Sequence, residues 1–248
     1  MRWRLIPFHV LTASLNMAID ECLAERVASG ASEPTIRLYG WHPSAVSIGR
    51  FQGLNDEVDV EECRRLGIDI VRRRTGGGAV YHDREGEITY SVIAPEKEMD
   101  ADLGVCYREV CGCLADALGS LGVEAEFRPV NDIVVAGKKI SGSASTKRGG
   151  AFLQHGTLLL SVDPGLMFRV LKVSRTKASD KDLAAVEERV TALDMHVPAD
   201  KRQVLDALEA SFRSKFDPSP GALTDSELMR AYEIAAERFG SWSWTSLR

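Results

Sequence analysis

Apolar residues recur along this chain at two spacings, and the spacing predicts which segments are helices and which are strands. Steps of three and four residues predict amphipathic helices at 15–27 and 103–121. Shorter alternating or continuous apolar runs predict strands at 35–39, 45–48, 68–73, 79–82, 87–94, 124–128, 132–136, 139–143 and 151–162. The remainder favours helices at 165–173, 201–216 and 225–239.

Many of the predicted strands follow one another with few helices between them. This order favours an α+β domain, with a mixed, largely antiparallel sheet flanked by helices, over a doubly wound sheet. The chain shows no internal repeat and no low-complexity tract, and the Pro-rich run at 217–221 is a rigid connector rather than a linker. We therefore expect one domain that covers residues 1–248.

Composition limits the partners. The 248 residues are 44% hydrophobic with a net charge of −5, which is typical of a globular protein and argues against nucleic acid as the main partner. No apolar run approaches the roughly 20 residues that span a bilayer, and the N-terminus does not resemble a secretory signal. We expect a cytoplasmic protein with no membrane partner.

Five cysteines are present, and their odd number predicts reduced thiols rather than a disulfide framework. The spacing of Cys106, Cys111 and Cys113 does not match a zinc site. Cys106 and Cys113 lie on or near the apolar stripe of the 103–121 helix and are expected in the core. Cys111 lies off that stripe by this count and receives no role.

The segment Arg72-Arg73-Arg74-Thr75-Gly76-Gly77-Gly78-Ala79-Val80-Tyr81-His82-Asp83 carries the strongest chemical signal. Three glycines allow positive φ and close approach of a ligand, so that their amides can converge on an anion. The arginines offer permanent charge for a carboxylate or phosphate. The alternative is a glycine-rich hairpin beside a solvated basic strand. It is not a Walker loop, because Ala-Val-Tyr follows the last glycine.

Two further segments add to this signal. The first, Asn131-Asp132 followed by Lys138-Lys139-Ile140-Ser141-Gly142-Ser143-Ala144, predicts a strand, a turn with two lysines, and a returning strand of small residues. The second, Gln154-His155-Gly156-Thr157-Leu158-Leu159-Leu160, places a polar step before an apolar strand. In this order and spacing, the three segments resemble the lipoate–protein ligase family, over most of the chain.

The resemblance implies a sheet-centred catalytic domain shared with biotin–protein ligases, in the short form without a C-terminal accessory domain. It implies that lipoate or a medium-chain acid is activated by ATP as an acyl-adenylate and transferred to a lysine of an acceptor protein. ATP with Mg²⁺ and lipoate are then substrates, and no tightly bound prosthetic group is expected. The expected partners are a lipoyl-acceptor domain protein and a separate small accessory protein.

The resemblance also assigns roles to single residues. Lys139 is the expected catalytic residue, and Lys138 an exposed neighbour. The residues expected at ATP and the adenylate are Arg73, Gly76, Gly77, Gly78, Ala79, Val80, Tyr81, Asn131, Asp132 and Lys139. Those expected at the acyl substrate are Arg73, Gly77, Lys139, Gly142, Ser143, Ala144, His155 and Gly156. Asp132 is the candidate ligand of Mg²⁺. The polar segment 171–189 is expected either as a loop that closes over the adenylate or as a solvated surface loop.

Three alternatives stay open. An octanoyltransferase of the same fold needs a cysteine nucleophile, and no cysteine follows Cys113 in this chain, which counts against that route. A biotin ligase shares the fold and also activates its acid as an acyl-adenylate, but its glycine loop differs from the one in this chain. A non-catalytic accessory member is disfavoured by the presence of Arg73, Asp132 and Lys139. The preferred acid, the identity of the acceptor and the oligomeric state cannot be read from the sequence.

Overall fold

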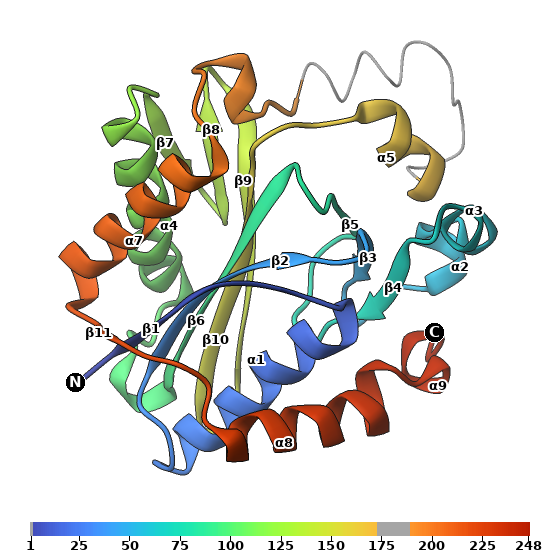
Figure 1. Cartoon of the computed structure of the whole chain (residues 1–248), viewed down its shortest axis with the longest axis horizontal. Helices are drawn as coiled ribbons and strands as arrows, with labels where there is room; N and C mark the ends of the chain where they lie inside the picture. The colour runs from blue at the N-terminus through green and yellow to red at the C-terminus, as the bar shows by residue number, and fades with distance from the viewer. Residues whose placement is uncertain (1, 173–188) are drawn as a thin grey trace.

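A central eight-stranded sheet organises the molecule in a computed structural model that describes residues 2–172 and 189–248 (Figure 1). Its strands stand in the order β11 (Ser219–Pro220), β1 (Arg4–Leu11), β2 (Thr35–Trp41), β6 (Glu87–Pro95), β10 (Ala151–Leu159), β9 (Lys138–Arg148), β8 (Asp132–Val135) and β7 (Ala125–Arg128). The β11–β1 and β1–β2 pairs are parallel, and the pairs from β2 to β7 are antiparallel. The predicted mixed, largely antiparallel sheet is confirmed.

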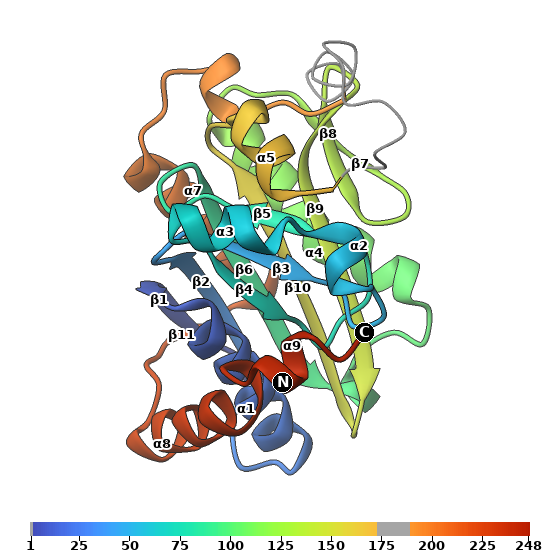
Figure 2. The same cartoon turned by 90° about the vertical axis from the view of Figure 1, so that its right-hand side faces the viewer.

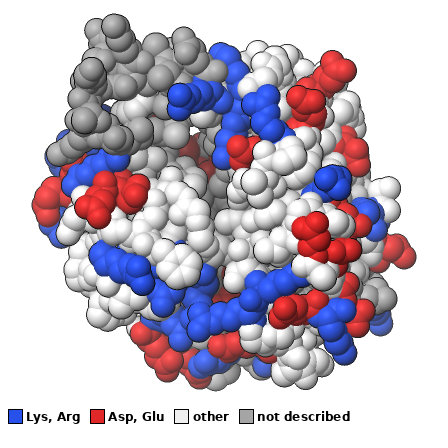
Figure 3. All heavy atoms as spheres, turned by 180° about the vertical axis from the view of Figure 1, so that it is seen from behind, with Lys and Arg blue, Asp and Glu red and all other residues white. Residues whose placement is uncertain are grey.

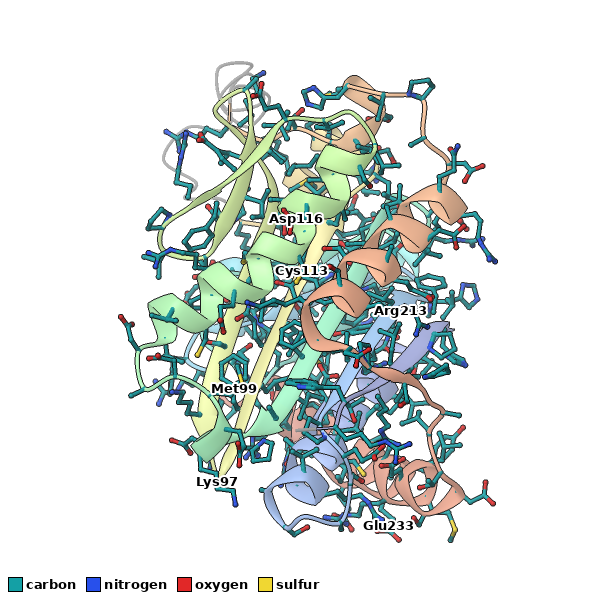
Figure 4. All side chains as sticks on the ribbon, turned by 90° about the vertical axis from the view of Figure 1, so that its left-hand side faces the viewer. Lys97, Met99, Cys113, Asp116, Arg213 and Glu233 are labelled. Atoms are coloured by element: carbon teal, nitrogen blue, oxygen red, sulfur yellow. The ribbon has the colours of Figure 1, made fainter. Side chains whose placement is uncertain are left out.

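Helices cover both faces of this sheet. On one face, α4 (Leu103–Ser120) and α7 (Lys201–Phe216) lie side by side, with Cys113 of α4 and Arg213 of α7 labelled in Figure 4. On the other face, α1 (Ala13–Ala28) packs against the sheet and against α8 (Asp225–Ile234). The two faces bury separate apolar clusters, so that the sheet is apolar on both sides.

A second, three-stranded sheet stands beside the long strands (Figure 2). It has the order β4 (Asp69–Arg72), β3 (Ala45–Ile48) and β5 (Val80–His82). Its apolar cluster is shared with the short helices α2 (Leu54–Glu57), α3 (Val60–Leu66) and α5 (Pro164–Val170). The remaining short elements are η1 (Glu96–Glu98), η2 (Leu193–Met195), η3 (Ala235–Phe239) and α9 (Trp242–Thr245). No helix within the described ranges is both long and apolar enough to cross a membrane.

Local capping explains where several helices begin and end. The Thr12 side chain accepts from the amide of Leu15 at the start of α1. A reciprocal capping box of Asp200 and Gln203 begins α7. Gly122 follows α4 with φ +85°, as its position after the predicted helix required.

The cysteines are free and buried. Cys106 and Cys113 lie in the core of α4 as predicted, but the expectation that Cys111 lies off the apolar face is wrong, because its side chain is fully buried. The apolar face of α4 is wider than a single stripe, since the helix packs both on the sheet and against α7. Cys111 therefore points into the interior behind β9 and β10, where its Sγ lies 3.5 Å from Ser143 Oγ.

Candidate active site

A pocket of about 340 Å³ lies between the small sheet and strands β9 and β10. Figure 3 shows a hollow on this side of the molecule, between the two parts that the sheets form. The pocket has the size of a small-molecule site. It brings together most of the residues that the sequence nominated: Arg73, Gly77, Gly78, Ala79, Val80, Tyr81, Asn131, Lys139, Gly142, Ser143, Ala144, His155 and Gly156. Gly76 and Asp132 lie next to these residues along the chain but do not line the pocket.

One wall is formed by β9 and β10, and it presents Lys139. The Lys139 Nζ lies 2.6 Å from Asp132 Oδ1, and both side chains are partly exposed. Lys139 folds back across its own strand over Gly142, where an added Cβ would lie 2.5 Å from Nζ. A side chain at position 142 would therefore displace the end of this lysine. Asp132, the candidate Mg²⁺ ligand, is the ion-pair partner of this lysine.

Close packing between strands explains the glycine at 156. A Cβ there would approach Ser143 Oγ at 2.7 Å, the Gly142 carbonyl at 2.8 Å and Tyr90 at 2.8 Å. Ser143 is fixed in turn by Tyr90, whose Oη lies 2.7 Å from Ser143 Oγ. Asn131 holds the backbone of the same residue. Its carbonyl accepts a hydrogen bond from the Ser143 amide, and its side-chain Nδ2 donates one to the Ser143 carbonyl. These contacts fix the position of Ser143 and leave no room for a side chain at Gly156.

The opposite wall is the loop of three glycines. Gly49 packs directly against this loop, and a Cβ added to Gly49 would lie 2.1 Å from the Gly77 carbonyl oxygen. Gly77 has φ +94°, a backbone conformation that favours glycine. No amide from Gly76 to Ala79 donates a hydrogen bond to another residue within the described ranges. These N–H groups can therefore receive an anionic ligand.

The three successive arginines have three different environments. Arg72 is fully buried and donates to backbone carbonyls of Gln52 at 2.7 Å and Thr245 at 2.8 Å. Arg74 pairs with Glu21 at 3.3 Å, beside a second and smaller cavity of about 160 Å³. Arg73 alone lines the main pocket. Its guanidinium is buried, and this burial lowers the pKa to about 10, so the group stays charged at neutral pH.

A buried polar cluster supports the base of the pocket. Asp20 of α1 accepts from Arg37 Nη1 at 2.7 Å and lies 3.2 Å from His155 Nδ1. Burial by itself would raise the pKa of Asp20, but Arg37 and the hydrogen bond with His155 outweigh it, and the pKa is lowered. Burial lowers the pKa of His155, although Asp20 opposes that change. The cluster therefore holds a carboxylate beside a neutral imidazole.

Sequence reasoning missed several of these groups. Asp20 and Asn16 stand one turn apart on a helix, and both are buried. Two polar residues on the apolar face of a predicted helix were the available signal for a buried network. Trp41 was also missed: it lines the pocket and stacks on His82 with ring centroids 4.0 Å apart. Nothing local distinguishes it from an ordinary core tryptophan.

No group of three or more His, Cys, Asp or Glu side chains suited to a metal ion occurs within residues 2–172 and 189–248. A single carboxylate such as Asp132 suits Mg²⁺ that arrives with substrate phosphates. The segment expected to form a loop over the adenylate falls mainly on residues 173–188, which lie outside the described residues.

Comparison with known proteins gives a consistent result. The family model described as "Lipoyl protein ligase A/B catalytic domain" matches residues 12–213. A curated relative, octanoyltransferase LipM of Kyrpidia tusciae, is 36% identical, with 95% of each chain covered. The bipartite lipoate protein ligase of Thermoplasma acidophilum has a similar structure, with TM-score 0.89, 29% identity, and coverage of 100% of this chain and 98% of that one. A lipoate-protein ligase A solved with bound ATP gives TM-score 0.85 and 29% identity, with 99% of each chain covered.

Proposed function

Since this chain belongs to the lipoyl protein ligase A/B catalytic-domain family, we propose that it is an ATP-dependent lipoate–protein ligase. The family includes both ligases and octanoyltransferases, so the proposal concerns which of the two reactions this member performs. The observation that carries it is the chemistry of the pocket. Among the described residues a lysine lines it, and no cysteine does.

The first proposed step joins two anions. A carboxylate oxygen of lipoate, or of a medium-chain acid, attacks the α-phosphorus of Mg-ATP, and pyrophosphate leaves as its bond to that phosphorus breaks. Lys139 stabilises the negative charge between the acid and the α-phosphate, while the amides of the glycine loop receive phosphate oxygens. A cation is needed here because two like charges must approach within bonding distance. The ATP-bound ligase with the same fold supports a nucleotide in this pocket.

The second proposed step moves the acyl group. The neutral ε-amine of a lysine on an acceptor protein attacks the acyl carbon of the mixed anhydride. The bond from that carbon to AMP breaks, AMP leaves with the electron pair, and the amine loses one proton. The Thermoplasma ligase was solved as part of a system with an E2 lipoyl domain, which supports an acceptor of that class. Mg²⁺ enters only as the partner of ATP.

Octanoyl transfer is the second candidate, because curated relatives bear that name. Such a transfer through a thioester would need a nucleophilic thiolate. The nearest thiol to the pocket is that of Cys111, which lies behind Ser143 and is fully buried. Burial raises the pKa of the Cys111 thiol, which keeps it protonated at neutral pH. The geometry thus favours the ligase.

The test compares acyl donors with the purified chain and an apo lipoyl domain. Lipoate, octanoate and biotin are each supplied with Mg-ATP, and pyrophosphate release and acceptor mass are measured. Octanoyl-acyl carrier protein is supplied in parallel without ATP. We expect ATP-dependent modification with lipoate or octanoate and none with biotin. Modification of the acceptor by octanoyl-acyl carrier protein alone would show that the chain is a transferase and not a ligase. Pyrophosphate release with biotin only would overturn the proposed acid substrate.

A further inference from the structure

Arg73 has five N–H groups, and each of them has an acceptor within the protein. Nε donates to Thr75 Oγ1 at 3.2 Å. Nη1 donates to the carbonyl and the hydroxyl of Ser47, at 3.1 and 3.2 Å. Nη2 donates to the carbonyls of Gly76 and Gly78, both at 2.7 Å. Sequence reasoning placed Arg73 on the substrate, but in this arrangement its donors are already used.

Two of those acceptors are the ends of longer chains of hydrogen bonds. From Thr75, the first chain continues to His155 Nε2 at 2.7 Å, and from His155 Nδ1 to Asp20 at 3.2 Å. Asp20 belongs to α1 and lies 135 residues from His155 in the sequence. The four side chains are all buried. We call this series the Asp20 relay.

The second chain has the same chemical order on the other side of the guanidinium. From the Ser47 hydroxyl it continues to His82 Nε2 at 2.8 Å, and from His82 Nδ1 to Glu87 at 2.8 Å. Thr89 also donates to the same oxygen of Glu87, at 2.6 Å. These residues are buried too. We call this series the Glu87 relay.

The hydrogen-bond inventory fixes the direction of both relays. Arg73 can only donate, so the Thr75 and Ser47 hydroxyl oxygens accept from it. Each hydroxyl proton is then free to point to the Nε2 of its histidine. For a neutral ring this leaves the proton on Nδ1, facing the carboxylate, which can only accept. A proton on Nε2 would instead set the bare Nδ1 against Asp20 or Glu87.

The position of Arg73 in turn sets the glycine loop. Its Nη2 turns the carbonyls of Gly76 and Gly78 inward. In a trans peptide the carbonyl and the following N–H point in opposite directions, so the amides of Gly77 and Ala79 point away from Arg73. Gly77, Gly78 and Ala79 line the pocket. The guanidinium therefore acts on a ligand through the backbone that it orients.

We propose that the Asp20 and Glu87 relays are a positioning device that presets Arg73, and through it the amides that receive the phosphate of the nucleotide. The identification of the ligand as a nucleotide phosphate rests on the proposed ligase function, whereas the two hydrogen-bonded relays do not depend on that function. In this arrangement Arg73, Thr75 and Asp20 are positioning residues that act without touching the substrate. Hydrogen bonds from two relays, on two sides of the guanidinium, fix its plane and prevent its rotation. A single hydrogen bond would leave that rotation free.

Thr75 offers the sharpest test, because it is fully buried and does not line the pocket. Thr75→Val keeps the shape and removes the hydroxyl, whereas Thr75→Ser keeps the hydroxyl and serves as the matched control. We expect Thr75→Val to raise the dissociation constant of ATP, measured by calorimetry, by about tenfold, the effect of about one well-placed hydrogen bond. Thr75→Ser should stay within about twofold. A folded Thr75→Val protein that binds ATP as the wild type does would overturn the proposal.

A readout without ligand separates this proposal from the proposed function. Ring ¹⁵N spectra, recorded at a pH where both rings are neutral, should show His155 and His82 with protonated Nδ1 and bare Nε2. Thr75→Val should shift the amide resonances of Gly77 to Ala79, and Thr75→Ser should leave these close to their wild-type positions. Ser47→Ala, read in the same way, tests the Glu87 relay. The relays would be refuted by a wild-type ring protonated on Nε2, or by loop amides that do not move in either Thr75→Val or Ser47→Ala. If the spectra show both relays and the chain fails to bind ATP, the proposed ligase function is refuted instead.

Discussion

The two walls of the pocket each present one cation, and they hold it in opposite ways. Arg73 on the glycine-loop wall is 5% exposed and donates to five acceptors of its own protein. Lys139 on the β9 wall has a side chain that is 43% exposed and an ion pair with Asp132. The first cation is surrounded by acceptors of its own protein, and the second is a partly exposed member of an ion pair.

This difference indicates which cation can respond to a substrate. A partly exposed ion pair contributes about 0–1 kcal/mol, so Lys139 can leave Asp132 for a phosphate at little cost. Arg73 would have to abandon several buried hydrogen bonds, each of which leaves an acceptor without a donor. One wall is therefore preorganised, and the other supplies the group that moves.

Loss of the mobile cation should have the largest effect. Lys139→Ala removes the charge proposed to lie between the acid and the α-phosphate, and we expect acyl-adenylate formation to fall by about 10²–10³-fold. Lys138→Ala is the matched control, because the neighbouring side chain is exposed and does not line the pocket. It should change the rate by less than about twofold. Single-turnover pyrophosphate release measures both, and equal losses in the two proteins would show that the wrong lysine was assigned.

The fixed cation should matter for stability as well as for activity. Arg73→Lys replaces five planar donors with three and leaves two or three buried acceptors unpaired, at a cost of about 2–4 kcal/mol. For a chain of this size, that corresponds to a fall of roughly 4–8 °C in Tm. Lys139→Ala should move Tm by no more than about 2 °C. Calorimetry distinguishes the two walls, and equal shifts in Tm would remove the contrast between them.

The sequence predicted most of the frame because its helices and strands have regular apolar spacing. The 201–216 helix and the 45–48 strand were placed with their observed ends. Strand β1 was missed: it contains Pro7, and its register with β2 shifts between Ile6 and His9, so its apolar pattern is interrupted. The short helices α2 and α3 are too brief for a period to show.

The site was predictable where chemistry is local and not where it depends on distant partners. The glycine loop and Lys139 stand in segments whose composition is unusual, and the structure places both at one pocket. The three adjacent arginines look alike in sequence, yet only Arg73 lines that pocket. What separates them is the partner that each one meets, such as Thr245 for Arg72, which lies 173 residues away. No local pattern encodes such a pairing.

Acid should weaken the preset wall through His155. The folded-state pKa of His155 lies below its usual value because the ring is buried, so below about pH 6.5 the unfolded chain binds a proton that the folded chain resists. Stability therefore rises with pH through this window and is lost as pH falls, with a slope of at most about 1.4 kcal/mol per pH unit for one group. His155→Gln should flatten this part of the curve of unfolding free energy against pH. An unchanged slope in that variant would assign the loss to other groups.

The smallest effect is expected at the one thiol that lies near the mobile wall. Cys111 Sγ is 3.5 Å from Ser143 Oγ and 3.7 Å from Gln154 Nε2, on the far side of the strands from the pocket. Its burial and raised pKa make it a packing group, so Cys111→Ser should keep ATP-dependent lipoate transfer within about twofold. Cys111→Ala is a useful second variant, because a serine hydroxyl there needs a partner that alanine does not. The rate per folded molecule, corrected for any loss of Tm, is the quantity to compare. If either protein folds normally and loses transfer while Lys139→Ala retains it, the reactive group is the buried thiol, and the contrast between a fixed and a mobile cation does not describe how this pocket works.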